Sequence, residues 1–190
     1  MMNKSSKVNF ENKVVIITGA GNGLGKAYAL DLANRGAKVV VNDLGGSVDG
    51  SGSANTPADD VVEEIKKNGG EAVANYSSVS TKEGGDAIIS TAMDAYGTVD
   101  AVVNNAGILK DKSFVKMTED DFSAVIDVHL KGAFYVSQPA FKIMKENSYG
   151  RIVNIASPSG LFGNFGQANY GAAKMGIVGL TNVLAIEGAK

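Results

Sequence analysis

Tyr170 and Lys174 are the residues whose types and spacing most directly suggest chemistry, in the pattern Tyr-x-x-x-Lys. On a helix, residues four apart lie on one face, so the phenol and the ammonium would be neighbours. A phenol, with its ordinary pKa near 10, is a poor base at neutral pH. A cation about 4 Å away stabilises a phenolate by roughly 4 kcal/mol at an effective dielectric near 20. This is enough to bring the pKa of a phenol down to about 7. Tyr170 is therefore predicted to accept the proton of an alcohol as hydride leaves the alcohol carbon.

Ser157 precedes Tyr170 by thirteen residues and follows the apolar stretch 152–155. If that stretch is a strand, Ser157 lies at its carboxyl end, where open α/β sheets bind ligands. Pro158 disfavours the helical region for the residue before it, which would hold Ser157 extended. We predict that its hydroxyl hydrogen-bonds the substrate oxygen. Ser159 is the competing candidate, and either serine could serve only to cap a turn.

A glycine-rich run, TGAGNGLG, occupies residues 18–25 directly after an apolar stretch. Glycines let a chain turn tightly and approach a pyrophosphate, and the amino end of a following helix attracts the anion. The run departs from the G-x-G-x-x-G spacing and lacks the Lys-Ser/Thr ending of a nucleoside triphosphate site. It predicts a dinucleotide site; the alternative is a turn without a ligand. The residues expected to contact the cofactor are Gly19, Gly21, Asn22, Gly23, Leu24 and Gly25.

Asp43 lies eighteen residues beyond Gly25, at the end of the second apolar stretch. A carboxylate there can accept hydrogen bonds from a ribose 2′-hydroxyl and would repel a 2′-phosphate. No Arg or Lys lies within residues 18–25 or directly after Asp43 to favour that phosphate. The predicted cofactor is NAD rather than NADP.

The elements that must position these residues alternate between short apolar strands and longer amphipathic helices. The apolar runs are β-branched and nearly continuous, as strands buried on both faces should be. Alternation of this kind predicts parallel βαβ units and a Rossmann-like, doubly wound α/β sheet. The expected strands are residues 14–17, 39–41, 72–74, 101–103 and 152–155.

The helices carry recognisable starts. Thr56 precedes Pro57 as an expected N-cap for residues 58–67, and residues 80–83 (STKE) suggest a capping box ahead of residues 87–96. Thr118 is expected to open a long helix reaching about Lys145, and a last helix should span residues 168–187. Residues 44–55 form a long Gly/Ser loop, either a mobile surface insertion or a lip over the cofactor's adenosine end.

Composition narrows the class of protein. The chain has 190 residues, 44% apolar content and a formal charge of −2, which fits one domain over residues 1–190 and gives no basic patch for nucleic acid. No apolar run could cross a bilayer, and residues 1–12 lack the apolar stretch of a secretory signal. The absence of cysteine excludes disulfides and thiolate zinc sites. We expect a soluble intracellular protein.

The order and spacing of these motifs resemble the short-chain dehydrogenase/reductase family. The resemblance rests on residues 18–25, residues 104–107 (NNAG), Ser157, Tyr170 and Lys174. It implies that Tyr170 is the acid/base, that Lys174 lowers its pKa and binds the nicotinamide ribose, and that Ser157 holds the substrate oxygen. It also implies that the cofactor is lined by Asn105, Ala106 and Gly107, residues that otherwise indicate only a tight polar turn after a strand.

His129 is the one departure from the family pattern and the only histidine of the chain. Many family members carry at this position an asparagine that supports a water leading to the catalytic lysine. One interpretation is that His129 takes over this relay, which the ordinary titration range of histidine would suit. The other is a hydrogen-bonded helix histidine without a catalytic role.

The chain is similar to a narrower group, the (3R)-hydroxyacyl-CoA dehydrogenase units of peroxisomal multifunctional β-oxidation enzymes. This similarity implies NAD-dependent oxidation of an acyl-CoA substrate in the peroxisome, and pairing of the two long helices with a second copy or a sister unit. The alternatives are an enzyme acting on a steroid, sugar or acyl-carrier alcohol, and a non-catalytic nucleotide-binding module. The similar segments are residues 39–46, 69–76, 107–111 and 163–170, together with His129.

Family members continue past the Tyr170 helix through two further strands and a substrate-covering helix. The chain is therefore expected to be an amino-terminal fragment, truncated after the helix that carries Tyr170 and Lys174. Its strand at residues 152–155 would then be an exposed sheet edge, which favours association. Alone, such a fragment should be weakly stable and poorly active.

Overall fold

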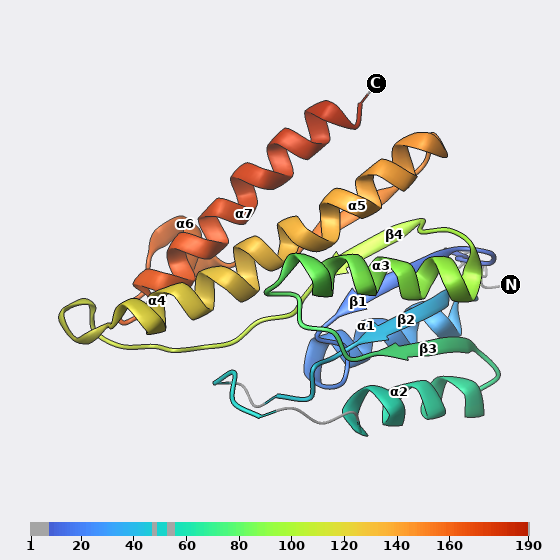
Figure 1. The fold of residues 1–190 in the computed structure, drawn as a ribbon, viewed down its shortest axis with the longest axis horizontal. Helices are drawn as coiled ribbons and strands as arrows, with labels where there is room; N and C mark the ends of the chain where they lie inside the picture. Colours follow the sequence, from blue (N-terminus) through green and yellow to red (C-terminus); the bar gives the residue numbers. More distant parts are fainter. Residues whose placement is uncertain (1–7, 47–48, 53–55, 190) are drawn as a thin grey trace, which may run out of the picture.

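The computed structural model describes residues 8–46, 49–52 and 56–189, and its centre is one parallel sheet (Figure 1). The strand order is β3-β2-β1-β4-β5, and every neighbouring pair is parallel. This confirms the predicted Rossmann-like, doubly wound sheet. The strands are β1 (Val14–Thr18), β2 (Lys38–Asn42), β3 (Glu71–Asn75), β4 (Ala101–Asn104) and β5 (Arg151–Asn154).

The strand order reverses at β1, which pairs with β2 on one side and β4 on the other. In open α/β sheets the carboxyl ends of the strands on either side of such a reversal frame the ligand crevice. The residues that follow β1, β2 and β4 are the glycine-rich run, Asp43 and Asn105. The topology thus brings the predicted cofactor residues to one edge of the sheet.

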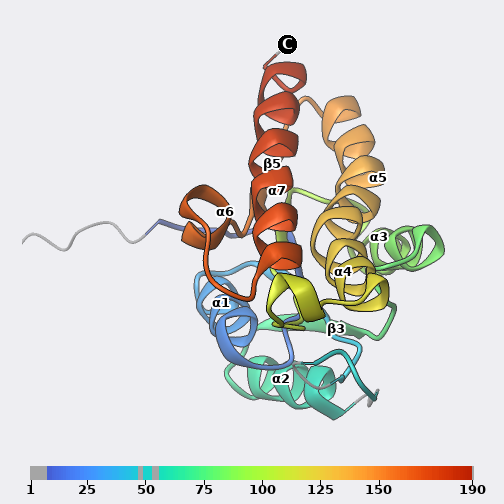
Figure 2. The ribbon, with the colours of Figure 1, turned by 90° about the vertical axis from the view of Figure 1, so that its left-hand side faces the viewer.

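Helices cover both faces of the sheet. Alternate residues of β1 and β2 pack with α1 and α2 on one face, and the intervening residues pack with α3 and α5 on the other. The carboxy-terminal helix α7 lies beside α4 and α5 (Figure 2). The helices are α1 (Gly23–Asn34), α2 (Thr56–Lys67), α3 (Lys82–Tyr96), the 3-10 turn η1 (Phe114–Lys116), α4 (Glu119–Ile126), the π turn η2 (Asp127–Lys131), α5 (Gly132–Glu146), α6 (Pro158–Phe162) and α7 (Ala168–Glu187).

Two predicted helix starts were wrong by one residue. Thr81, not Ser80, caps α3, because its hydroxyl accepts the Gly84 amide at 3.1 Å. The glycine at that third helical position cannot return the hydrogen bond, so no capping box forms. Thr56 is the first residue of α2 rather than its cap. In the predicted Gly/Ser loop before it, residues 47, 48 and 53–55 lie outside the described residues.

The long helix that opens at Thr118 is confirmed, with a complete capping box formed with Asp121. It is not uniform, however, because a π turn, η2, lies between α4 and α5. Single π turns inside helices occur frequently at functional sites. His129 lies in this turn.

Strand β5 forms one edge of the sheet, and Val153 on it is 49% exposed. This agrees with the expectation of an exposed edge. Among the described residues, no helix combines the length and apolar character needed to span a membrane.

Candidate active site

The glycine-rich turn between β1 and α1 leaves no room for side chains at its contact points. Gly19 has φ +63°, and a Cβ added to Gly25 would lie 2.1 Å from the Gly19 carbonyl oxygen. Asn22 precedes α1 in an extended conformation, with no side-chain hydrogen bond capping the helix start. The turn therefore exposes the amino end of a helix at close range, as a pyrophosphate site requires.

Thr18 and Asn105 fasten this turn to the end of β4. The Thr18 hydroxyl accepts the amides of Asn105 and Ala106 at 3.1 and 3.0 Å, while the Asn105 side chain donates to the carbonyls of Thr18 and Gly19, both at 3.0 Å. The NNAG segment is thus more than a polar turn. The structural role of Thr18 was missed, although a threonine ending a buried apolar strand could have indicated it.

Asp43 connects the end of β2 with the glycine-rich turn. One carboxylate oxygen accepts the Gly21 amide at 2.8 Å, and the other accepts the Gly45 amide at 2.7 Å. A Cβ on Gly21 would lie 2.8 Å from the same carboxylate. The acid is therefore held against the turn, in the place expected for a ribose-binding carboxylate.

A groove of about 520 Å³ runs along this edge of the sheet. Six predicted cofactor residues line it: Gly19, Asn22, Asp43, Asn105, Ala106 and Gly107. Gly21 of the turn and Gly23, Leu24 and Gly25 of the first turn of α1 do not line it. Gly46 and Gly50 of the Gly/Ser loop also line it, which places described parts of that loop along the groove.

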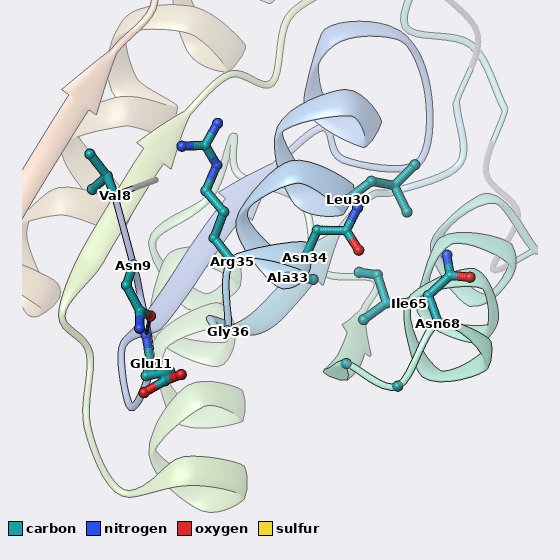
Figure 3. Close-up of a pocket in the computed structure, with 12 residues that line it drawn as sticks. Val8, Asn9, Glu11, Leu30, Ala33, Asn34, Arg35, Gly36, Ile65 and Asn68 are labelled. Atoms are coloured by element: carbon teal, nitrogen blue, oxygen red, sulfur yellow. Dashed lines mark hydrogen bonds between the residues drawn. The ribbon is translucent and has the colours of Figure 1, made fainter. Parts of the chain in front are cut away.

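A second depression, of about 460 Å³, lies at the opposite, amino-terminal edge of the sheet (Figure 3). It is bounded by the short connections that precede β1, β2 and β3, including Glu11, Gly36 and Gly70. None of the predicted cofactor residues lines it, whereas six of them line the groove, so the depression is not the cofactor site. Ser157, Tyr170 and Lys174 line neither of the two.

Tyr170 and Lys174 lie one turn apart at the start of α7, as predicted. The Lys174 ammonium is 5.5 Å from the centre of the Tyr170 ring and donates to the Ile155 carbonyl beyond β5. Lys174 is only 3% exposed, and burial lowers its pKa to about 8. The arrangement places a buried cation beside a half-buried phenol.

Ser157 is extended, with φ −151° and ψ 146°, as Pro158 was expected to require. Its hydroxyl accepts the Ser159 amide at 3.2 Å and so caps α6, a short helix that the sequence pattern did not indicate. Capping uses one acceptor site of the hydroxyl and leaves its proton available to a substrate oxygen.

His129 is buried in the π turn, edge-on to Tyr170 with ring centres 5.1 Å apart. Its Nε2 lies 3.1 Å from the amide nitrogen and 2.9 Å from the carbonyl oxygen of Ile108. A Cβ on Gly107 would lie 2.3 Å from the imidazole, which explains a glycine there. Burial, with a smaller effect of the Lys174 charge, lowers the His129 pKa to about 4. The ordinary titration range that favoured a relay through the ring therefore does not apply.

We expect His129→Asn to keep kcat within about fivefold of the wild type, the value of one neutral hydrogen bond of about 1 kcal/mol. Because the imidazole is neutral well above pH 4, the pH–rate profiles of the two proteins should coincide between pH 6 and 8. Steady-state rates across that range provide the measurement. A step in the wild-type profile that the substitution removes would show that the ring titrates during turnover.

Comparison with known proteins agrees with this geometry. The family model for short chain dehydrogenase matches residues 13–190. The chain is 61% identical over 183 residues to the peroxisomal hydratase-dehydrogenase-epimerase of Saccharomyces cerevisiae, covering 96% of this chain and 20% of that protein. It is 55% identical over 190 residues to the peroxisomal multifunctional enzyme type 2 of Drosophila melanogaster, covering 100% of this chain and 31% of that protein.

A crystal structure of a short chain dehydrogenase from Mycobacterium avium superposes with a TM-score of 0.86 at 44% identity, over 95% of this chain and 64% of that chain. The chain spans 20% and 31% of the two curated relatives named above. The family match, by contrast, covers nearly the whole chain. The chain therefore belongs to the short chain dehydrogenase family and carries an oxidoreductase unit of the kind that acts on hydroxyl groups.

Proposed function

We propose that residues 1–190 form one NAD-binding unit that oxidises a (3R)-3-hydroxyacyl-CoA to the 3-ketoacyl-CoA. The observation that supports this best is the half-buried Tyr170 phenol beside the buried Lys174 ammonium, one helical turn apart. In this proposal the Lys174 ammonium stabilises the Tyr170 phenolate, which accepts the hydroxyl proton and becomes a phenol, while Ser157 orients the same oxygen.

The groove fits a dinucleotide because its walls combine backbone amides, a helix start and a carboxylate. The amino end of α1 would face the pyrophosphate, Asp43 the ribose hydroxyls, and the segment after β4 the nicotinamide half. When bound, the nicotinamide supplies the acceptor for hydride. The protein supplies orientation and the path for the proton.

An apolar substrate is favoured by the surface beside Tyr170. The segments that follow β4 and β5 are joined by a 2.9 Å hydrogen bond from the Lys112 amide to the Gly166 carbonyl. Large apolar side chains are exposed on both, as a fatty acyl chain requires and a sugar does not. They are Phe114, Val115, Leu161, Phe162 and Phe165.

The test is NAD reduction with a defined (3R)-3-hydroxyacyl-CoA, using the longest natural form of the protein. The (3S) epimer, a steroid alcohol, a sugar alcohol and a hydroxyacyl carrier protein serve as comparisons. We expect the (3R) acyl-CoA to give the highest kcat/KM. A higher kcat/KM for another alcohol would support the dehydrogenase activity and contradict the proposed acyl-CoA substrate.

Location and assembly follow from the same relatives. Both curated relatives named above are peroxisomal by name, so we propose a peroxisomal location, which microscopy of the tagged full-length protein can test.

We also propose that α4, α5 and α7 pair with a second copy or a sister unit, since Phe134, Met175 and Val183 are exposed on α5 and α7. Light scattering measures this association.

We expect NAD to be preferred over NADP, and Asp43→Ala to weaken NAD binding by about 10- to 100-fold. The ribose would lose one hydrogen bond to a charged group, worth about 1.5–3 kcal/mol or about 10- to 100-fold in affinity. The turn would also lose the carboxylate that accepts the Gly21 and Gly45 amides. Titration of both cofactors measures the effect. Asp49→Ala is the matched control, because Asp49 bonds only Ser51 among the described residues. A wild type that prefers NADP would contradict the proposal.

A further inference from the structure

We infer that Asn169 is a positioning residue that sets the distance between Tyr170 and the cofactor groove. Asn169 is fully buried, and it lies directly before Tyr170 in α7. Its side-chain nitrogen donates to the Lys110 carbonyl and to the Asp121 carbonyl, both at 3.0 Å, and its oxygen accepts the Tyr170 amide at 2.7 Å. The inference rests on the proposed dehydrogenase function.

These three hydrogen bonds fix the start of α7 to two other segments. Gln167, the residue before α7, makes no side-chain hydrogen bond to the helix, so the first-turn amides need another partner. Asn169 supplies one for Tyr170 and uses both of its own N–H groups on carbonyls of the loop after β4 and of α4. Because a buried amide without partners is costly, this orientation is strongly preferred.

The loop after β4 contacts both parts of the site, the glycine-rich turn and the start of α7. At one end, Asn105 holds the glycine-rich turn through the Thr18 and Gly19 carbonyls. At the other end, the Lys110 carbonyl holds Asn169, and between them Ile108 holds His129 against the Tyr170 ring. Asn169 thus closes a chain of contacts running from the pyrophosphate turn to the proton-accepting phenol.

Other contacts between the same segments lie nearer the surface. Asp111 accepts the Gln167 side chain at 2.7 Å in an exposed pair, and the Lys112–Asp121 ion pair is half exposed on the lysine side. Exposed polar pairs contribute little because water competes for both partners. Within the described residues, Asn169 is therefore the buried side chain that ties the Tyr170 backbone to the loop.

The experiment compares Asn169→Ala and Asn169→Ser with the wild type, in the longest natural protein, on the alcohol that the wild type oxidises fastest. Asn164→Ala is the matched control, since Asn164 is exposed, lies in the same connection and, among the described residues, makes a side-chain hydrogen bond only to the half-buried Gln167. Serine leaves a smaller cavity than alanine and keeps a hydroxyl at this position, but it is too short to reach the Lys110 and Asp121 carbonyls. Both variants therefore remove the tie between α7 and the loop.

We expect both Asn169 variants to lose about 10- to 100-fold in kcat per NAD-binding molecule, the cost of a misplacement of about 1 Å. The NAD dissociation constant and the control should stay within about twofold of the wild type. The loss should fall on kcat rather than on KM for NAD, because Asn169 does not line the cofactor groove.

Wild-type kcat in Asn169→Ser would overturn the inference, because the enzyme would then work without the hydrogen bonds to Lys110 and Asp121. So would a loss that appears in the NAD dissociation constant rather than in kcat, which would indicate a residue that supports the fold of the cofactor groove. If Asn169→Ala does not fold, kcat of Asn169→Ser alone tests the inference. Since all variants are compared on the alcohol that the wild type prefers, rejection of the acyl-CoA substrate leaves this test intact.

Discussion

Tyr170→Phe is expected to lower kcat for alcohol oxidation by about 10²- to 10⁴-fold, the usual contribution of a positioned acid/base. The substitution removes only the hydroxyl oxygen, while the ring keeps its edge-on contact with His129. Folding and NAD binding should therefore be unchanged. Stopped-flow or steady-state NADH formation, with NAD titration on the same sample, measures both quantities.

Tyr149→Phe is the matched control for Tyr170→Phe, because Tyr149 lies between α5 and β5, outside the proposed site. Its activity should match the wild type within about twofold. If Tyr170→Phe were equally active, the acid/base assignment would be lost. The non-catalytic nucleotide-binding module would then be the better interpretation.

Lys174→Met is expected to abolish most activity and at the same time to stabilise the unliganded fold at neutral pH. Burial lowers the pKa of Lys174 from 10.5 to about 8, so the charged form is disfavoured in the folded state. This cost is fully present below pH 8 and disappears as the pH rises towards 10.5, where the unfolded chain also loses the proton. At pH 7 it amounts to about 3 kcal/mol, an upper limit because the Ile155 carbonyl loses its donor in the variant.

Denaturant unfolding of the wild type and Lys174→Met at pH 7 and pH 9 measures this effect. The stability advantage of the variant should be larger at pH 7 and shrink at pH 9. Lys142→Met, a change on the exposed side of α5, should alter neither activity nor the pH dependence of stability. A variant that is less stable than the wild type at pH 7 would show that the ammonium stabilises the fold.

The strands and the cofactor turn were predictable because their constraints are local. Four of the five strands are β-branched apolar runs, which suit strands covered on both faces. The glycines of the turn are fixed by close backbone contacts, such as Gly25 against the Gly19 carbonyl, which a short motif encodes. Tyr170 and Lys174 were predictable for the same reason, because helical spacing alone makes them neighbours.

Features that depend on distant contacts were not predictable. The π turn contains His129, whose ring contacts Ile108 and Tyr170, 21 and 41 positions away in the sequence. Asn169 contacts residues 48 and 59 positions earlier, and nothing in its local pattern indicates this. The choice of Thr81 over Ser80 as a cap depended on a one-residue shift that local propensity does not resolve.

The segment from residue 105 to 110 acts as a spacer of fixed length between two anchors. Ile108 and Lys110 use backbone atoms for their contacts with His129 and Asn169, so their side chains can vary. Inserting or deleting one residue would shift one anchor against the other by up to about 3.5 Å, more than hydride transfer tolerates. At Ile108 and Lys110, selection should therefore act on the number of residues between the anchors more strongly than on side-chain identity.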